Sequence, residues 1–310
     1  MAGTSQSSDR AQVFFTGLAA GTFSKGVAAT INAPLERVRL LLQVQGFPGH
    51  IPQDQRYTGA INALRRLPAE QGLVSLWRGN LANIIRFVPT YCLNAAMASK
   101  YKSLFPKYNA RTDFWKFFMT SMASAGLAGA TSLLFVYPLD LARTRMALDV
   151  GVGPSRQFSG LWNCLSTVYQ RGGIGALYSG YGTSVAAIVL HRALFFGIYD
   201  TAKQITTRDG RRPSYFAAWL MAQGITTAVA LATYPLDTIR RHLMMQAGAS
   251  TPTYAGAVDC ARTLYTTGGI RAFYGGVHLQ LLAPIVATLL SVLYDYYKQS
   301  RKQAPRKANA

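Results

Sequence analysis

Three short blocks of this sequence combine a proline, an acid and a base at constant spacing. They are Pro34–Arg39, Pro138–Arg143 and Pro235–Arg240, and each reads proline, any residue, acid, two residues, base. An acid and a base three residues apart share one face of a helix, so each block offers both charges to the same side. The chemistry that this arrangement supports is reversible ion pairing. Charges beside long apolar segments are costly to separate, which suits a contact that opens and closes.

The proline blocks are the first of three marks that recur in a fixed order. Each block is followed by two aromatic-x-Gly motifs whose glycines lie 20 residues apart. These glycines are Gly59, Gly79, Gly160, Gly180, Gly256 and Gly276. A period near 100 residues is too long for a solenoid repeat. We therefore predict three copies of one small unit, at residues 1–108, 109–208 and 209–310.

Each unit contains two long, mostly apolar segments separated by a loop and a short helix. About 20 such residues span the hydrocarbon core of a bilayer. The six segments are Val13–Ala33, Leu81–Ala98, Phe114–Pro138, Thr183–Tyr199, Tyr215–Pro235 and Leu279–Tyr294. The alternative is a soluble bundle of six amphipathic helices, but soluble helices rarely carry so little charge over such lengths. The pattern favours an all-α membrane protein whose helices face lipid on one side and a polar cavity on the other.

The charge and the cysteines limit the class of partner. The formal net charge is +20, and the bases lie mostly between the apolar segments. Nucleic-acid-binding proteins gather such residues in stripes, so anionic lipid or a polyanionic solute is the better partner and no nucleic acid is expected.

Cys92, Cys164 and Cys260 lack the spacing of a disulfide framework or a metal site, and we interpret them as apolar fillers. The absence of a Gly-rich phosphate loop or a catalytic triad argues against an enzyme.

The repeated blocks and their flanking residues resemble the mitochondrial carrier family over nearly the whole chain, and among its branches the ADP/ATP carriers most. The stretches that carry this resemblance are Pro34–Gln45, Trp77–Asn83, Phe135–Arg145 and Tyr199–Lys203. The resemblance implies six transmembrane helices in three pseudo-symmetric repeats with short matrix helices. It also implies a multi-pass protein of the inner mitochondrial membrane that works by alternating access, with a gate on each side of a central cavity.

In this family, the proline blocks form the matrix gate. A threefold arrangement lets each acid meet the base of the next repeat. The predicted pairs are Glu36 with Arg143, Asp140 with Arg240, and Asp237 with Arg39. Gln43 occupies the place of the family's bracing glutamine, and the matching residues Ala147 and Met244 predict a single brace.

The cytoplasmic gate of the family uses an aromatic residue, an acid and a base at the ends of the even-numbered helices. The matching charged residues here are Lys102, Asp200, Lys203, Asp295 and Lys298. Ser99 replaces the acid of the first repeat, so two pairs remain possible, Asp200 with Lys298 and Asp295 with Lys102. Lys203 lacks a partner, and we expect a weakened gate. The alternative is that these are ordinary charges in the lipid head-group layer.

The solute site that the resemblance implies is basic. Lys25 and Arg86 lie inside apolar segments at the family's phosphate-binding positions, although Lys25 has the alternative of snorkelling to the interface. The segment Arg240–Met245 reads RRHLMM where the ADP/ATP carriers have RRRMMM, and Arg241 is the better candidate for a solute contact. Ala283 stands where a cavity arginine is expected.

An adenine-binding wall is expected on the fourth long helix. Its residues are Ala187, Ile188, His191 and Arg192, with His191 equally explained as a polar cavity liner. Asn94 and Thr233 are expected as polar groups of the cavity.

These residues predict exchange of ADP for ATP without covalent chemistry. The alternatives are a carrier of the same fold for another nucleotide or anionic metabolite, and a non-transporting membrane protein. We expect a monomer without a cofactor or metal. Cardiolipin phosphates are expected at the six motif glycines, where helix amides could hold them, unless these glycines simply mark helix ends.

Overall fold

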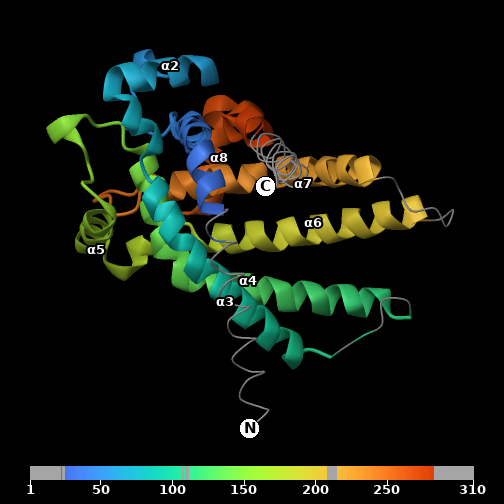
Figure 1. Ribbon diagram of the computed structural model, residues 1–310. Helices are drawn as coiled ribbons and strands as arrows, with labels where there is room; N and C mark the ends of the chain where they lie inside the picture. The colour runs from blue at the N-terminus through green and yellow to red at the C-terminus, as the bar shows by residue number, and fades with distance from the viewer. Residues whose placement is uncertain (1–21, 23–24, 107, 109–111, 208–214, 283–310) are drawn as a thin grey trace, which may run out of the picture.

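The computed structural model describes residues 22, 25–106, 108, 112–207 and 215–282, and this part of the chain is helical without strands (Figure 1). The first helix covers residues 25–44, and another helix begins at residue 277. Between them lie α2 (Ala60–Gln71), α3 (Asn80–Leu104), α4 (Phe114–Leu148), α5 (Leu161–Leu177), α6 (Tyr181–Thr207), α7 (Tyr215–Met245) and α8 (Ala257–Gly268). The predicted order of long, short and long helix within a repeat and the all-α fold class are confirmed.

The longest helix is α4, which has 35 residues. It is therefore about 50 Å long, more than the thickness of a bilayer core. Within the described residues, α4 is the one helix that is long and apolar enough to span a membrane by itself, and α5 with Tyr181–Phe195 passes the same criterion as a pair bent by 52°. Helices that line a polar cavity carry charged residues, as α3 carries Arg86, so this criterion does not select all the predicted spans.

The threefold repeat is visible in hydrogen bonds as well as in sequence. The first helix, α4 and α7 each carry a proline block, and we call them the proline-block helices. Just beyond the end of each one, a side-chain oxygen accepts a hydrogen bond from the backbone N–H of the next aromatic-x-Gly motif. The bonds are Tyr57 to Gln45 at 2.9 Å, Phe158 to Asp149 at 3.3 Å, and Tyr254 to Gln246 at 2.9 Å. The three units therefore share one loop geometry.

The short helices α2, α5 and α8 gather at the end of the molecule where the proline-block helices finish (Figure 1). Two clusters of buried apolar side chains join them to those helices. Cys260 belongs to the first cluster and Cys164 to the second, and both are fully buried free thiols. Burial raises the pKa of each thiol to about 12, so both stay protonated at neutral pH and act as apolar fillers.

Neighbouring repeats pack through their long helices. Helix α3 of the first repeat lies against α4 of the second, α6 lies against α7, and α4 also contacts α6 within its own repeat. Residues of all three proline blocks line one cavity that the long helices surround.

Candidate functional site

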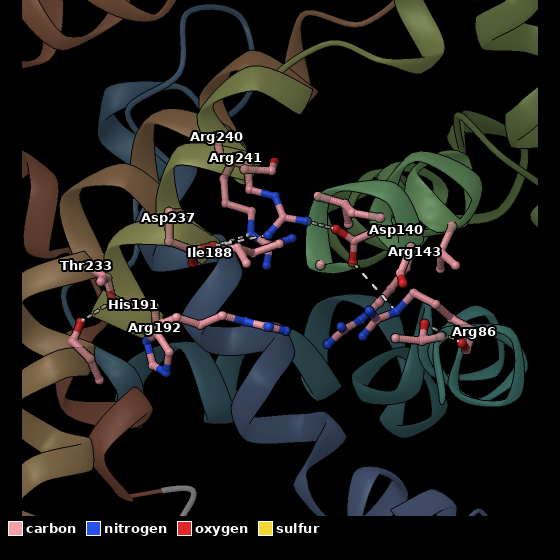
Figure 2. Close-up of a pocket in the computed structure, with 18 of the residues that line it drawn as sticks. Arg86, Asp140, Arg143, Ile188, His191, Arg192, Thr233, Asp237, Arg240 and Arg241 are labelled. Carbon is pink, nitrogen blue, oxygen red and sulfur yellow. Dashed lines mark hydrogen bonds and ion pairs between the residues drawn. The ribbon is translucent and has the colours of Figure 1, made fainter. Parts of the chain in front are cut away.

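A cavity of about 480 Å³ lies between the long helices (Figure 2). Its walls come from the first helix, α3, α4, α6, α7 and the helix that begins at residue 277. Eight of the nine predicted solute-binding residues line it, namely Arg86, Asn94, Ala187, Ile188, His191, Arg192, Thr233 and Arg241. The predicted site residues therefore converge on one space, although they come from all three repeats.

The ninth residue, Lys25, lines an adjoining cavity of about 320 Å³. The two cavities share Arg39, Arg86 and Arg143, so they form neighbouring parts of one basic region. The side chain of Lys25 is exposed, and its ammonium lies 5.5 Å from the centre of the Tyr91 ring. This distance allows a cation–π contact.

Two of the three predicted pairs between repeats are present. Glu36 is ion-paired with Arg143, and Asp140 is ion-paired with Arg240. Figure 2 shows Asp140 between Arg240 and Arg86, whose Nε lies 3.7 Å from the other Asp140 oxygen. Asp140 is only 2% exposed. A carboxylate buried to this degree requires charged partners, and here it has cations on two sides.

The third predicted pair is wrong for this structure. Among the described residues, Asp237 forms no ion pair with Arg39; its oxygen instead lies 3.4 Å from Arg241 Nε and 3.9 Å from Arg240. Arg241 is four residues beyond Asp237 on α7, so the two share a helix face and pair locally. Arg39 is left lining both cavities, and in the described part its Nε has no hydrogen-bond partner.

Arg241 therefore has a different setting from the one that the sequence predicts. Its side chain reaches the cavity wall but is only 6% exposed, and it also donates a hydrogen bond of 2.5 Å to Thr144 Oγ1. Both arginines line the cavity and are buried, since Arg39 is 8% exposed. They differ in their partners: Arg241 contacts Asp237 and Thr144, whereas the side chain of Arg39 has no ion pair or hydrogen bond in the described part.

Gln43 makes the contact expected of a brace. Its amide nitrogen donates to Thr238 Oγ1 at 2.8 Å and to Asp237 Oδ2 at 3.4 Å. These bonds join the first repeat to the third at the place where an Asp237–Arg39 pair was predicted. The neutral amide of Gln43 thus binds the Asp237 carboxylate, for which the cation Arg39 was predicted.

The wall formed by α6 has an apolar strip and a basic edge. Ala187 and Ile188 supply the strip, and the ring of His191 stacks on Phe195 with a centroid distance of 6.5 Å. Arg192 donates a hydrogen bond to the Ala125 carbonyl. Gly129 makes this packing possible, because a Cβ on it would lie 3.0 Å from Ile188 Cγ2.

Sequence reasoning missed several polar residues that line the cavity. They are Thr90, Ser132, Ser184, Tyr234 and Gln280. Most follow helical steps of three or four residues from predicted positions: Thr90 lies four residues after Arg86, and Tyr234 lies three before Asp237. Extending the helical period from each charged residue along its helix would have found them.

The six motif glycines all stand at helix starts. Gly59, Gly160 and Gly256 directly precede α2, α5 and α8. Gly79 and Gly180 precede α3 and α6, and Gly276 precedes the helix that begins at residue 277. Binding of lipid at these positions stays a prediction.

The predicted cytoplasmic gate falls mostly on residues whose arrangement is not described. Asp295, Lys298 and Ala283 lie outside the described residues, and so do the side chains of Asp200 and Lys203 on α6. Lys102 is exposed near the end of α3. The pairs predicted for this gate stay predictions.

The charges that line the larger cavity are strongly unbalanced. Six arginines and two aspartates do so: Arg39, Arg86, Arg143, Arg192, Arg240 and Arg241, with Asp140 and Asp237. A guanidinium binds phosphate or carboxylate oxygens through paired N–H donors. The cavity is thus built to attract a polyanion, with an apolar strip beside the charges.

Comparisons with known proteins agree with this arrangement. The family model of mitochondrial carrier proteins matches the chain three times, at residues 11–109, 114–210 and 212–304. An ADP,ATP carrier protein of Parachlorella kessleri is 48% identical over 288 residues, which cover 92% of this chain and 85% of that protein. ADP/ATP translocase 2 of Bos taurus is 45% identical over 295 residues, covering 94% and 99%. ADP/ATP translocase 4 of Mus musculus is 44% identical over 288 residues, covering 92% and 90%.

The family matches cover almost the whole chain, and each contains one proline block and two aromatic-x-Gly motifs. The fold, the basic cavity and the relatives agree on a transporter rather than an enzyme. The chain therefore belongs to the mitochondrial carrier family, as a multi-pass transport protein of the inner mitochondrial membrane.

Proposed function

We propose that this protein exchanges ADP for ATP by alternating access. The observation that carries the proposal is the set of arginines around the cavity. In the described part, Arg39, Arg86, Arg240 and Arg241 each have a buried Nε without a hydrogen-bond partner, and Arg39 and Arg86 also line the adjoining cavity. A buried guanidinium with an unused donor is costly unless an anion occupies the space beside it. The phosphate chain of a nucleotide supplies several acceptor oxygens for Arg39, Arg86 and Lys25.

The rest of the nucleotide has a matching surface. Ala187 and Ile188 present the apolar strip, and His191 lies on the same helix one turn further on. A flat base can lie on such a strip while the phosphates reach the arginines on the other walls. The cavity volume of about 480 Å³ falls within the range of about 300–1,000 Å³ that is typical of small-molecule sites.

Opening of the matrix gate requires the pairs between repeats to separate. Arg86 already lies near Asp140, so an arriving phosphate competes with this carboxylate for the same cation. A solute that binds the intermediate arrangement more tightly than the closed one lowers the cost of breaking the Asp140–Arg240 and Glu36–Arg143 pairs. Movement of the solute then needs no bond chemistry.

The test is exchange by the purified protein in liposomes that contain ATP. Labelled ADP, GTP, inorganic phosphate and a tricarboxylate are offered outside, with empty liposomes as the control. We expect saturable uptake of ADP that depends on internal ATP and is inhibited by external ATP. Transport of another anion, without ADP, would support a carrier of the same fold for a different solute. Absence of all exchange by folded protein would favour a non-transporting membrane protein.

We also propose that the protein binds cardiolipin as a monomer. Helices α2, α5 and α8 begin at Gly59, Gly160 and Gly256, and none of these starts has a side-chain cap. Such helix starts keep backbone N–H groups available for a phosphate. The prediction is checked by native mass spectrometry of the purified protein, which should show one chain retaining cardiolipin in preference to a zwitterionic phospholipid; equal retention of both lipids would contradict it.

A further inference from the structure

Three of the motif glycines have a backbone conformation that other residues rarely adopt. The φ angle is 82° at Gly79, 82° at Gly180 and 73° at Gly276. Each stands at the start of the second long helix of its repeat. A side chain is disfavoured in this left-handed region because its Cβ approaches the backbone too closely.

The same three glycines lie against the proline-block helix of the next repeat. In each case, one of the neighbouring atoms is the backbone carbonyl oxygen of the arginine that ends the proline block, although Tyr137 Oη is slightly nearer to Gly180, at 3.1 Å. The distances from an ideal Cβ position to that oxygen are 2.7 Å for Gly79 to Arg143, 3.2 Å for Gly180 to Arg240 and 2.9 Å for Gly276 to Arg39. The contacts run from repeat 1 to 2, from 2 to 3 and from 3 to 1. The threefold recurrence shows that the contact belongs to the architecture of the repeat.

We propose that Gly79, Gly180 and Gly276, called the seat glycines below, set the distance at which the three repeats close the matrix end of the cavity. Two of the arginines whose carbonyls rest on seat glycines, Arg143 and Arg240, also form ion pairs of the gate, and the third, Arg39, lines the cavity. Arg143 illustrates this double role, with its carbonyl near Gly79 and its side chain paired with Glu36. The backbone distance at the seat therefore fixes where the charged group lies. The seat glycines are positioning residues, since they act through the arginines.

The seat contact is expected only while this end of the cavity is closed. When the repeats separate, the arginine backbone leaves the glycine, and a methyl group at that position no longer meets a carbonyl oxygen. A Gly→Ala substitution therefore disfavours the closed form more than the open form and shifts the population toward opening. This inference deepens the alternating-access part of the proposed function.

The chain supplies a matched set of control glycines. Gly46, Gly175 and Gly224 lie one in each repeat, are exposed and have no positive φ angle. No atom of the described part lies within 4 Å of a Cβ built on any of them. Alanine at these positions should leave the closed form unchanged.

The experiment measures opening directly and needs no nucleotide. A reporter cysteine is introduced by Thr144→Cys, because Thr144 lies at the closed end and is fully buried. The rate at which a maleimide labels position 144 is followed by mass spectrometry, which separates this peptide from those of Cys92, Cys164 and Cys260. The rate is compared between Gly79→Ala and Gly46→Ala, then between Gly180→Ala and Gly175→Ala and between Gly276→Ala and Gly224→Ala.

We expect labelling about tenfold faster with alanine at a seat glycine than at its control, because the contact between the added Cβ and the carbonyl oxygen exists only in the closed form; a tenfold shift corresponds to about 1.4 kcal/mol. Equal labelling would overturn the proposal, and so would a lower melting temperature with unchanged labelling, since that indicates a structural role alone.

A second variant, Gly79→Asn, is used if Gly79→Ala does not fold, because asparagine tolerates a positive φ but keeps the Cβ contact. It too should label faster than Gly46→Ala. If the protein does not exchange ADP in liposomes, the labelling result still tests this proposal, because the labelling assay contains no nucleotide.

Discussion

At the scale of single residues, the arrangement of Arg39 and Arg241 defines the site. Arg241 pairs with Asp237 on its own helix, whereas in the described part Arg39 forms no ion pair with Asp237 and lines both cavities. The local pair forms because residues four apart on a helix meet without help from tertiary structure. Arg39 is consequently the better phosphate contact, and Arg241 the better support for the buried carboxylate.

Substitution of the two arginines by glutamine should separate these roles. Arg39→Gln should reduce the rise in melting temperature that ADP produces, because a phosphate contact is lost. Arg241→Gln should lower the melting temperature without ligand, because removal of one partner of a buried pair costs about 3–5 kcal/mol. Melting curves with and without ADP measure both effects. The assignment is contradicted if Arg241→Gln abolishes the ADP shift at unchanged stability and Arg39→Gln does not.

At the scale of helices, buried side chains cap the C-terminal ends of the proline-block helices. Arg37 donates to the carbonyl of Ala147 at 3.0 Å, Arg145 donates to the carbonyl of Met245, and His242 Nε2 lies 3.3 Å from the carbonyl of Gln43. Each cap comes from the preceding repeat, so a ring of three caps links the helix ends. Cations at this position also interact favourably with the helix dipole.

The ring of three caps gives a structural role to His242, the histidine of the RRHLMM segment. His242 is 1% exposed and packs against the rings of Phe47 and Tyr254. It is not among the residues that line the two described basic cavities. The departure from the RRRMMM pattern therefore affects a contact between the third and first repeats, and it gives no reason to expect a different solute.

Loss of the Arg37 cap should destabilise the protein strongly. Arg37 is 1% exposed and donates hydrogen bonds to Gln71 and to the backbone of Ser75, Ala147 and Asp149. Arg37→Gln cannot satisfy all these carbonyls, and we expect a loss of about 2–4 kcal/mol.

The matched control for Arg37→Gln is Arg66→Gln, whose guanidinium forms a surface pair with Glu70 on α2. Such a pair contributes little, so its melting temperature should stay near that of the wild type. Thermal unfolding in detergent compares the two variants. Equal melting temperatures would show that the cap at the end of α4 has no stabilising role.

At the scale of the whole molecule, the three interfaces between repeats differ in strength. The first has the Glu36–Arg143 pair and the Arg37 cap, and the second has the Asp140–Arg240 pair and the Arg145 cap. The third relies on the Gln43 amide and the His242 ring. Neutral groups give weaker hydrogen bonds than ionised ones. We therefore expect the interface between repeats 3 and 1 to separate most easily.

The repeat made much of this architecture predictable. Blocks at nearly constant spacing located the helices and two gate pairs, because threefold symmetry constrains where equivalent residues meet. The eight cavity residues were predicted from the resemblance to the family. The prediction of an Asp237–Arg39 pair was wrong because threefold symmetry does not show that Arg241, on the same helix as Asp237, competes for its carboxylate. The left-handed glycines and the helix-end caps depend on backbone distances, which residue types alone do not reveal.

The measurement that tests the account most directly is ADP/ATP exchange in a charge swap across the first interface. Glu36→Arg alone and Arg143→Glu alone place like charges together at the matrix gate and should abolish exchange. The double variant, with both substitutions, restores an ion pair between repeats 1 and 2 and should recover a measurable part of the wild-type rate. Exchange that survives either single reversal, or a folded double variant as inactive as both singles, would contradict a cavity closed by ion pairs between repeats.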